Sequence, residues 1–325
     1  MINPPLKISV IIPVKNGAVT LDKCLSSIRS QTVPDLEIII LDSMSTDESR
    51  EIASGYNATI IDIPEGNFNH GLTRNIGVQH STGDFLFFTV QDAFLSENDL
   101  LEKMIKHFID DNVMGVAGHQ AVPHDKNKNP MLWYKPVSAP EMVVREIIDI
   151  QQFKQFSKEK QQSLISWDNV VAMYRRKALV QQPFVDTQFA EDWIWSRDAL
   201  MKGWRLIYDP SLVVYHYHHA GYSYAYKVAY AVNYHFYKFF NYKPAIPDFF
   251  KPVMKTVFHL GKNSELKTKE KLFWIFHNFY SKIGTFNSNV NFLLHNYMGG
   301  FDSVEKRYKK ICKEIPQGRT KEESL

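Results

Sequence analysis

Apolar and polar positions follow two alternating patterns in the first hundred residues of the chain. Short, almost wholly apolar runs stand at residues 9–14, 36–42, 58–63 and 85–90, and segments with helical spacing of their apolar residues lie between and after them. Continuous apolar runs of this length are typical of strands buried on both faces of a parallel sheet. The alternation predicts a doubly wound, mostly parallel α/β sheet of Rossmann-like type with right-handed crossovers.

Polar residues at the ends of the apolar runs set the expected boundaries of the helices. We expect Thr20 to cap a helix over residues 21–31, a further helix to begin at Thr73, and Ser96 to cap an amphipathic helix over 96–108. The two strand-like runs within 204–219 predict a hairpin, whereas the polar stretch 122–163 predicts no regular element.

The composition changes at Tyr222, where aromatic and basic residues with helical spacing begin. We therefore expect an α/β domain over 1–221, a helical region over 222–325 and a disordered tail from 317. An amphipathic helix in this region would suit an anionic membrane surface, on a face formed by Tyr224, Lys227, Tyr234, Tyr237 and Lys238. Packing on the first domain or on a second subunit explains the same pattern equally well.

Composition and charge exclude several classes of protein. The net charge of +3 over 325 residues is too small to indicate a nucleic-acid partner. No stretch reaches the roughly 18–20 apolar residues that a membrane-spanning helix needs, and the N-terminus does not resemble a secretory signal. The two cysteines, Cys24 and Cys312, form no metal or redox spacing, which favours a cytoplasmic protein with reduced thiols.

Polar side chains follow three of the predicted strands. Pro13, Lys15 and Asn16 end the first strand, Asp42 ends the second, and Gln91 and Asp92 follow the fourth. In open α/β sheets, ligands bind beyond the carboxyl ends of the strands. Asp42 is placed to accept hydrogen bonds from a base or ribose, with a capping role as the alternative. Asp92 is placed to bind Mg²⁺ or Mn²⁺, with a helix cap as the alternative.

Three further groups of residues carry candidate chemistry. Arg74 and Asn75 lie at a glycine-flanked helix start, where a cation and backbone donors suit a diphosphate. Glu191 and Asp192 begin a helix between aromatic residues, where one acid can act as a general base. Alternation along a strand places His216 and His218 on one face, where two imidazoles can join a metal site.

Taken together, these motifs resemble family 2 glycosyltransferases of the GT-A fold, and among them the bacterial rhamnosyltransferase-like branch. The resemblance runs from residue 7 to 223 and rests on FNHGLTRN (68–75), QDA (91–93), SWDNVVAMYRR (166–176) and VYHYHHAGYS (214–223). One position departs from the family pattern, because Val90 stands where the metal-binding DxD motif has its first acid. That motif corresponds to Val90-Gln91-Asp92 and leaves Asp92 as its carboxylate.

The resemblance implies a role for each candidate residue. The nucleoside pocket would be lined by Pro13, Lys15, Asn16 and Asp42, with Arg74 and Asn75 near the ribose and diphosphate and Gln91 and Asp92 at the donor. Asp192, with Glu191 beside it, would supply the base, and His216 would complete a Mg²⁺ or Mn²⁺ site with Asp92 and His218. The acceptor would be met by Trp167, Asp168 and Asn169, with Arg175 or Arg176 nearby.

The implied reaction is inverting transfer of a sugar from a nucleotide-sugar to a hydroxyl of a glycan or lipid-linked glycan, in bacterial surface polysaccharide synthesis. dTDP-rhamnose is the donor that the branch implies, and UDP-sugars are its rivals. A location in the cytoplasm or on the inner face of the membrane is expected, and a homodimer stays open. Glycoside hydrolysis by two carboxylates is disfavoured because it needs no nucleotide edge. Val90 keeps open a catalytically inactive nucleotide-binding or membrane scaffold protein.

Overall fold

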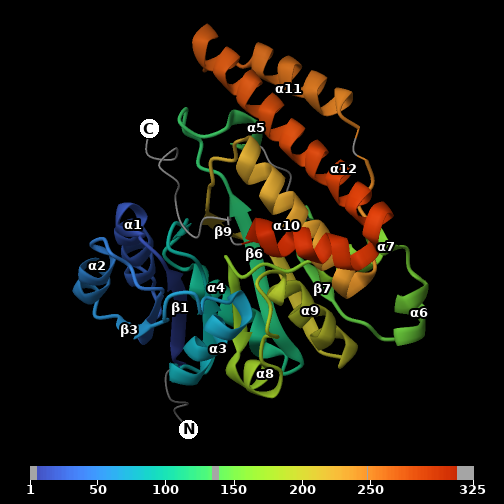
Figure 1. Ribbon diagram of the computed structural model, residues 1–325. Coiled ribbons are helices and arrows are strands. Elements are labelled where there is room, and N and C mark those ends of the chain that lie inside the picture. The colour runs from blue at the N-terminus through green and yellow to red at the C-terminus, as the bar shows by residue number, and fades with distance from the viewer. Residues whose placement is uncertain (1–5, 134–138, 247, 313–325) are drawn as a thin grey trace. The chain divides into compact units, whose positions relative to one another are not determined.

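The computed structural model describes residues 6–133, 139–246 and 248–312, and the chain divides into two compact units (Figure 1). Unit 1 consists of Met1–Ala121 and Pro136–Tyr217. Unit 2 consists of Val122–Lys135 and His218–Leu325. We describe each unit by itself. The disordered tail expected from 317 lies outside the described residues.

Unit 1 is built on one mixed sheet. Its strand order is β3-β2-β1-β4-β8-β6-β9-β5, with β7 paired to β9. The strands are β1 (Ile8–Val14), β2 (Leu36–Asp42), β3 (Thr59–Asp62), β4 (Phe85–Phe88), β5 (Phe94–Leu95), β6 (Val113–Ala121), β7 (Val143–Arg145), β8 (Ala172–Arg175) and β9 (Arg205–Tyr215). The first four run parallel, as the apolar runs predicted, and β8 joins them to β6 through antiparallel pairs. The predicted α/β class, with a helical C-terminal region, is therefore confirmed.

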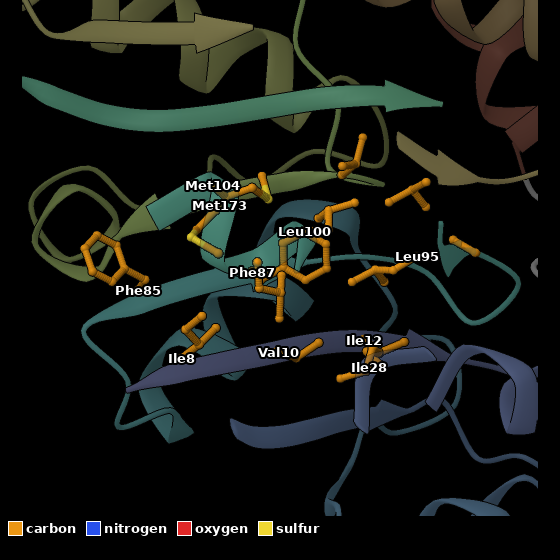
Figure 2. Packing of buried hydrophobic residues seen from close by; sticks show 14 of the residues in the cluster. Ile8, Val10, Ile12, Ile28, Phe85, Phe87, Leu95, Leu100, Met104 and Met173 are labelled. Atoms are coloured by element: carbon orange, nitrogen blue, oxygen red, sulfur yellow. The ribbon is translucent and has the colours of Figure 1, made fainter. Parts of the chain in front are cut away.

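Helices cover both faces of this sheet. They are α1 (Ala18–Arg29), α2 (Ser49–Gly55), α3 (His70–His80), α4 (Leu100–Lys106), the 3₁₀ turn η1 (His107–Ile109), α6 (Ile150–Gln155), α7 (Lys158–Ile165), α8 (Arg176–Gln181) and α9 (Glu191–Met201). On one face, alternate residues of β1 pack with β4, α1 and α4, and Figure 2 shows Val10 beside Phe87 in this core. On the other face α3 approaches closely, because a Cβ at Gly77 would lie 2.5 Å from Ile11 Cγ2.

Five expectations about the secondary-structure elements are wrong. Gly17 precedes α1, so Thr20 lies inside the helix, and α3 begins at His70 because Asn69 caps it. Ser96 donates to Val213 O instead of capping α4. Residues 204–219 do not form a hairpin, since both halves of β9 pair in parallel with β6, on either side of a register shift. The stretch 122–163, expected to be irregular, contains β7 and the short helices α5 (Pro130–Trp133), α6 and α7.

Unit 2 is helical, with α5, α10 (Tyr222–Phe240), α11 (Phe250–Lys262) and α12 (Thr268–Cys312), the last interrupted at Gly299 and Gly300. Helix α10 packs along α12 through an aromatic core in which Tyr234 stacks on Tyr308 at a ring distance of 4.0 Å. Tyr234 is 2% exposed, so at this residue α10 packs within unit 2, and the alternative of a membrane-facing surface does not hold there. Among the described residues, no helix combines the length and the apolar character that crossing a bilayer requires.

Candidate active site

The carboxyl ends of β1, β2 and β4 meet at one edge of the sheet, as predicted. The register aligns Val14 with Asp42. Lys15 Nζ donates to Ser43 O at 2.6 Å and Met44 O at 2.7 Å, and the backbone of Lys15 exchanges two hydrogen bonds with the Gln91 amide. Lys15 and Gln91 therefore connect the three strand ends to one another, and they shape the edge through contacts within the chain.

Two residues complete the loops of this edge. Asn16 adopts a left-handed conformation (φ 48°), and its Oδ1 accepts from Thr46 N at 2.9 Å. Asp42 is 1% exposed, and its Oδ2 accepts from Arg50 Nη1 at 2.9 Å. Asp42 Oδ1 is buried and has no hydrogen-bond partner among the residues that the structure describes. An unpaired carboxylate oxygen at this edge suits a donor group such as a ribose hydroxyl or a base N–H. Pro13 lies on β1 beneath these loops.

The segment FNHGLTRN holds the loop that leads to the acidic pair. Asn69 Oδ1 caps α3 by accepting from Gly71 N and Leu72 N, while its Nδ2 donates to Asp186 at 2.8 Å. Asn75 donates to Phe184 O at 2.8 Å and accepts from Phe184 N at 3.0 Å. Gly71 is required by close approach, since a Cβ there would lie 1.9 Å from Val185 O. Both amide atoms of Asn75 are used within the chain, and we do not propose it as a donor ligand.

Glu191 is a buried member of an ion pair. Arg74 Nη1 lies 3.0 Å from Glu191 Oε1, and the two side chains are 4% and 6% exposed. His70 stays neutral at physiological pH, because burial lowers its pKa to about 4, so its Nδ1 can accept from Arg74 Nη1 at 3.1 Å. Burial works to raise the pKa of Glu191, yet the net direction is downward because Arg74 stabilises the carboxylate. Arg74 is therefore the ion-pair partner of Glu191, and we assign it no contact with the diphosphate.

Two of the predicted acceptor residues belong to the same buried network. Asn169 Nδ2 donates to Glu191 Oε1 at 3.0 Å, and Asn169 Oδ1 accepts from Tyr174 OH at 2.5 Å. Trp167 Nε1 donates to that hydroxyl at 2.7 Å. Trp167 and Asn169 are 4% and 2% exposed. Buried polar groups that are satisfied in this way fix side-chain positions. Asn169 therefore holds Glu191 directly, and Trp167 does so through Tyr174 and Asn169.

Asp192 differs from its neighbour in its surroundings. Ala190, the residue before α9, has a left-handed conformation (φ 63°), which costs a non-glycine residue about 1–2 kcal/mol. Asp192 is half-buried, and its Oδ1 accepts from Trp193 N at 2.8 Å. Burial, the charge of Glu191 and the charge of Asp168 raise the pKa of Asp192 well above its usual range. A carboxyl group with a raised pKa is suited to general-base catalysis near neutral pH.

A second group of side chains connects Asp168 to Asp92. Gln120 Nε2 donates to Asp168 Oδ2, and because a carboxylate only accepts, Gln120 Oε1 must face the other way. There it lies 2.8 Å from His216 Nδ1, which therefore carries the proton. The other ring nitrogen of His216, Nε2, lies 3.4 Å from Asp92 Oδ1. In the neutral imidazole, the proton that Gln120 holds on Nδ1 leaves Nε2 with the lone pair that faces Asp92.

These donors fit a divalent cation. The ligand atoms of Asp92 and His216 lie within 4.8 Å of one another, and carboxylate oxygen with imidazole nitrogen is a donor set that Mn²⁺ accepts. Val90, which replaces the first acid of the family motif, packs against the apolar core of unit 1. His218 is the first residue of unit 2, and its membership of the metal site stays a prediction.

Sequence reasoning missed several residues of the site. Gln120 lies on β6, where glycines interrupt the apolar run. Tyr174 and His70 belong to the quoted motifs, but only the fold shows that they contact Asn169 and Arg74, the partners of Glu191. Arg50, the partner of Asp42, could have been found from the sequence, because it lies at the start of the helix that follows that acid. Arg175 and Arg176 donate to backbone carbonyls of Val113 and Gly83, so they hold loops together.

Comparisons with known proteins show which family the chain resembles. The glycosyl transferase family 2 model matches residues 9–181. The O-antigen chain rhamnosyltransferase RfbN of Salmonella typhimurium is 30% identical over 219 residues, which cover 66% of this chain and 67% of that protein. The O-antigen chain rhamnosyltransferase WbaN of Salmonella anatum is 31% identical over 215 residues, 65% of this chain and 66% of that protein. The matches thus span about two thirds of the length of each relative.

A solved structure shows the same fold. The mannosyltransferase PcManGT of Pyrobaculum calidifontis, determined in complex with GDP-Man and Mn²⁺, aligns with a TM-score of 0.53 at 18% identity and covers 97% of this chain and 82% of that one. Since the family model spans more than half of the residues and the sheet has the GT-A arrangement, the chain belongs to glycosyl transferase family 2.

Proposed function

We propose that the protein is an inverting glycosyltransferase that moves a sugar from a nucleoside diphosphate to a hydroxyl of a glycan or lipid-linked glycan acceptor. The best candidate donor is dTDP-rhamnose, by similarity to the two O-antigen rhamnosyltransferases, and the setting is synthesis of a bacterial surface polysaccharide. A UDP-sugar is the alternative donor. The observation that carries the proposal is the contrast at the start of α9, where Glu191 is ion-paired and Asp192 has a raised pKa.

In this mechanism Asp192 takes the proton of the acceptor hydroxyl. The acceptor oxygen then forms a bond to the anomeric carbon while the bond from that carbon to the diphosphate oxygen breaks on the opposite face. The nucleoside diphosphate leaves with the electron pair of the broken bond, and the configuration of the sugar inverts. A positioned base of this kind contributes about 10²–10⁴-fold to the rate.

Other residues would hold the reactants. Asp42 would bind the nucleoside through its unpaired Oδ1, on loops held by Lys15 and Asn16. Asp168, half-buried and close enough to Asp192 to raise its pKa, would meet the acceptor. Asp92 and His216 would hold a divalent ion, which when bound neutralises charge on the leaving diphosphate.

A panel of nucleotides tests the donor. The full-length protein is heated with dTDP, UDP or GDP, with and without Mn²⁺, and unfolding is followed by fluorescence. A ligand at about 100 times its dissociation constant adds about 2.7 kcal/mol of stability, which is easily visible as a rise in Tm. We expect dTDP to give the largest rise. A larger rise in Tm with UDP would make a UDP-sugar the donor in place of dTDP-rhamnose. No rise in Tm with any nucleotide would contradict the nucleotide-sugar reaction itself.

A product analysis tests the stereochemistry. With the preferred nucleotide-sugar and an acceptor glycan, the anomeric configuration of the new linkage can be read by NMR. We expect it to be opposite to that of the donor. Retention of configuration would contradict the single displacement, even if transfer occurs.

A further inference from the structure

Helix α11 carries an exposed apolar stripe. Phe250, Met254, Val257 and Phe258 are 78%, 64%, 40% and 56% exposed. Positions 250, 254 and 257/258 follow one another at the helical repeat, so these side chains share one face. Leu260, outside this stripe, is 1% exposed and packs into a small apolar cluster of unit 2. The stripe is thus the face that α11 leaves uncovered.

The beginning of α12 repeats this arrangement. Leu272, Phe273, Phe276 and Tyr280 are 51%, 53%, 58% and 56% exposed, whereas Trp274 is buried. Helix α11 runs alongside this part of α12 (Figure 1). We call these eight exposed residues of the two helices the α11–α12 patch. Bulky apolar side chains gathered in this way mark a site of interaction with a protein or a membrane.

The segment that carries the α11–α12 patch is rich in lysine. The segment 248–283 has seven lysines against three acids, and α11 contains no acid at all. Lys262 Nζ lies 4.1 Å from the centre of the Phe258 ring. Burial lowers the pKa of Lys282 of α12, and the nearby charge of Lys255 of α11 lowers it further. Neither of these two lysines forms an ion pair with any residue that the structure describes.

This charge distribution favours an anionic partner. In a symmetric dimer the patch would meet its own copy and bring lysine-rich surfaces together, which is unfavourable. Anionic headgroups would instead compensate lysines that border an apolar face, and the long lysine side chains can reach the headgroups while the apolar face is buried. Tyr280, with its apolar ring and polar hydroxyl, is typical of the interface between lipid and water.

We propose that the α11–α12 patch docks onto the surface of an anionic lipid bilayer. The apolar side chains enter the boundary between headgroups and acyl chains, and Lys255 and Lys262 of α11 approach the lipid phosphates. The helices lie on the membrane and do not cross it. This inference stands on residues of unit 2 that take no part in the proposed reaction, and it gives the enzyme a way to meet lipid-linked acceptors.

Vesicle flotation tests the proposal. The full-length protein is mixed with phosphatidylcholine vesicles that contain or lack phosphatidylglycerol, and the bound fraction is measured after centrifugation. We expect binding to the anionic vesicles that weakens as salt rises. Phe250→Ser with Phe258→Ser should reduce the partition coefficient at least about tenfold, because each fully buried Phe contributes a factor of that order. Lys255→Glu should reduce it about fivefold or more.

Matched controls separate this effect from a general loss of surface apolarity. Ile109 is 94% exposed on unit 1, so Ile109→Ser removes an apolar side chain that is more exposed than either phenylalanine but lies outside the patch, and it should leave vesicle binding unchanged. Circular dichroism and the nucleotide thermal shift on each variant report folding and donor binding. Because vesicle binding needs no donor, its failure is distinguishable from failure of the proposed reaction.

Three results would overturn the proposal. The first is a wild-type protein that floats with neither kind of vesicle. The second is equal flotation of the wild type and the double phenylalanine variant. The third is a wild-type dimer, seen by analytical ultracentrifugation, that the same double variant converts to a monomer while vesicle binding is absent; this would make the patch an interface between two copies of the chain.

Discussion

Replacing Glu191 by glutamine separates the roles of the two neighbouring acids. Glu191 and Arg74 are 3.0 Å apart and almost completely buried. Glutamine keeps the shape and can still accept from Asn169, so the variant removes the charge and leaves Arg74 buried without its counter-ion. Breaking a buried ion pair in this way costs about 3–5 kcal/mol. We expect Glu191→Gln to lose stability of that size.

Asp192→Asn is the matched comparison, one residue further along α9. Burial and the charges of Glu191 and Asp168 disfavour the ionised form of this carboxyl group. An amide removes that unfavourable charge, so the variant should be at least as stable as the wild type near neutral pH. The two substitutions therefore have opposite expected effects on stability, although each replaces an acid by its amide.

The dependence on pH has a definite sign for each acid. Because the pKa of Glu191 is lowered by folding, its contribution to stability is present above its usual value of 4.5 and is lost as the pH falls through the folded pKa. The pKa of Asp192 is raised, so its stabilising contribution is present below 3.8 and is lost as the pH rises through the folded pKa. The penalty of Glu191→Gln should therefore shrink in acid, whereas the benefit of Asp192→Asn should appear only at higher pH.

Urea denaturation followed by circular dichroism measures these differences. The double variant Arg74→Met with Glu191→Gln should recover part of the loss, because no buried charge is left unpaired. If Glu191→Gln unfolds within about 0.5 kcal/mol of the wild type, the ion pair does not hold the start of α9. Glu191 would then be as good a candidate for the base as Asp192.

Three further predictions concern the chemistry of the site. The acidic limb of the kcat/KM profile should lie well above the usual aspartate pKa of 3.8, because Asp192 must be ionised to act; a limb near 3.8 would contradict this. Gln120→Leu should weaken Mn²⁺ binding about 10–100-fold, measured by electron paramagnetic resonance, because His216 loses the partner that fixes its tautomer. The exposed Gln152→Leu is its control, and equal affinities in both variants would remove the role of Gln120. Asp92→Asn should abolish the extra thermal stabilisation that Mn²⁺ gives with a nucleoside diphosphate, and an unchanged shift would place the metal elsewhere.

The sequence predicts the nucleotide edge well, because the positions of the strands along the chain follow from local patterns. Apolar runs of four to seven residues identify β1 to β4, and polar residues at their ends fall on one edge by the geometry of a parallel sheet. The alternation also identifies the fold class. These features depend on periods of a few residues, which the chain displays directly.

The partners of Arg74 and Asn75 could not be read in the same way. Asn75 and Phe184 are 109 residues apart in the sequence, and only the packing of α3 against the loop before α9 shows that the FNHGLTRN segment holds the acidic pair. Trp167 and Asn169 face inward for the same reason, since their contacts are with Tyr174 and Glu191.

The apolar stripe of α11 is an intermediate case. The spacing of Phe250, Met254 and Phe258 is visible in the sequence, but Pro252 in the first turn of the helix obscures the pattern. Whether such a stripe faces solvent or a core can be seen only in the structure. The aromatic residues of α10 have the same helical spacing, yet Tyr230 and Tyr234 are buried in the core of unit 2.

The assignment of Asp192 as the base is tested most directly by measuring transfer and donor binding in the same variant. For Asp192→Asn, transfer to an acceptor glycan is followed with a radiolabelled nucleotide-sugar, and donor affinity is measured by calorimetry. We predict that transfer falls by about 10²–10⁴-fold while the donor Kd stays close to that of the wild type. Transfer near the wild-type rate, or a parallel loss of donor binding, would contradict the role assigned to Asp192.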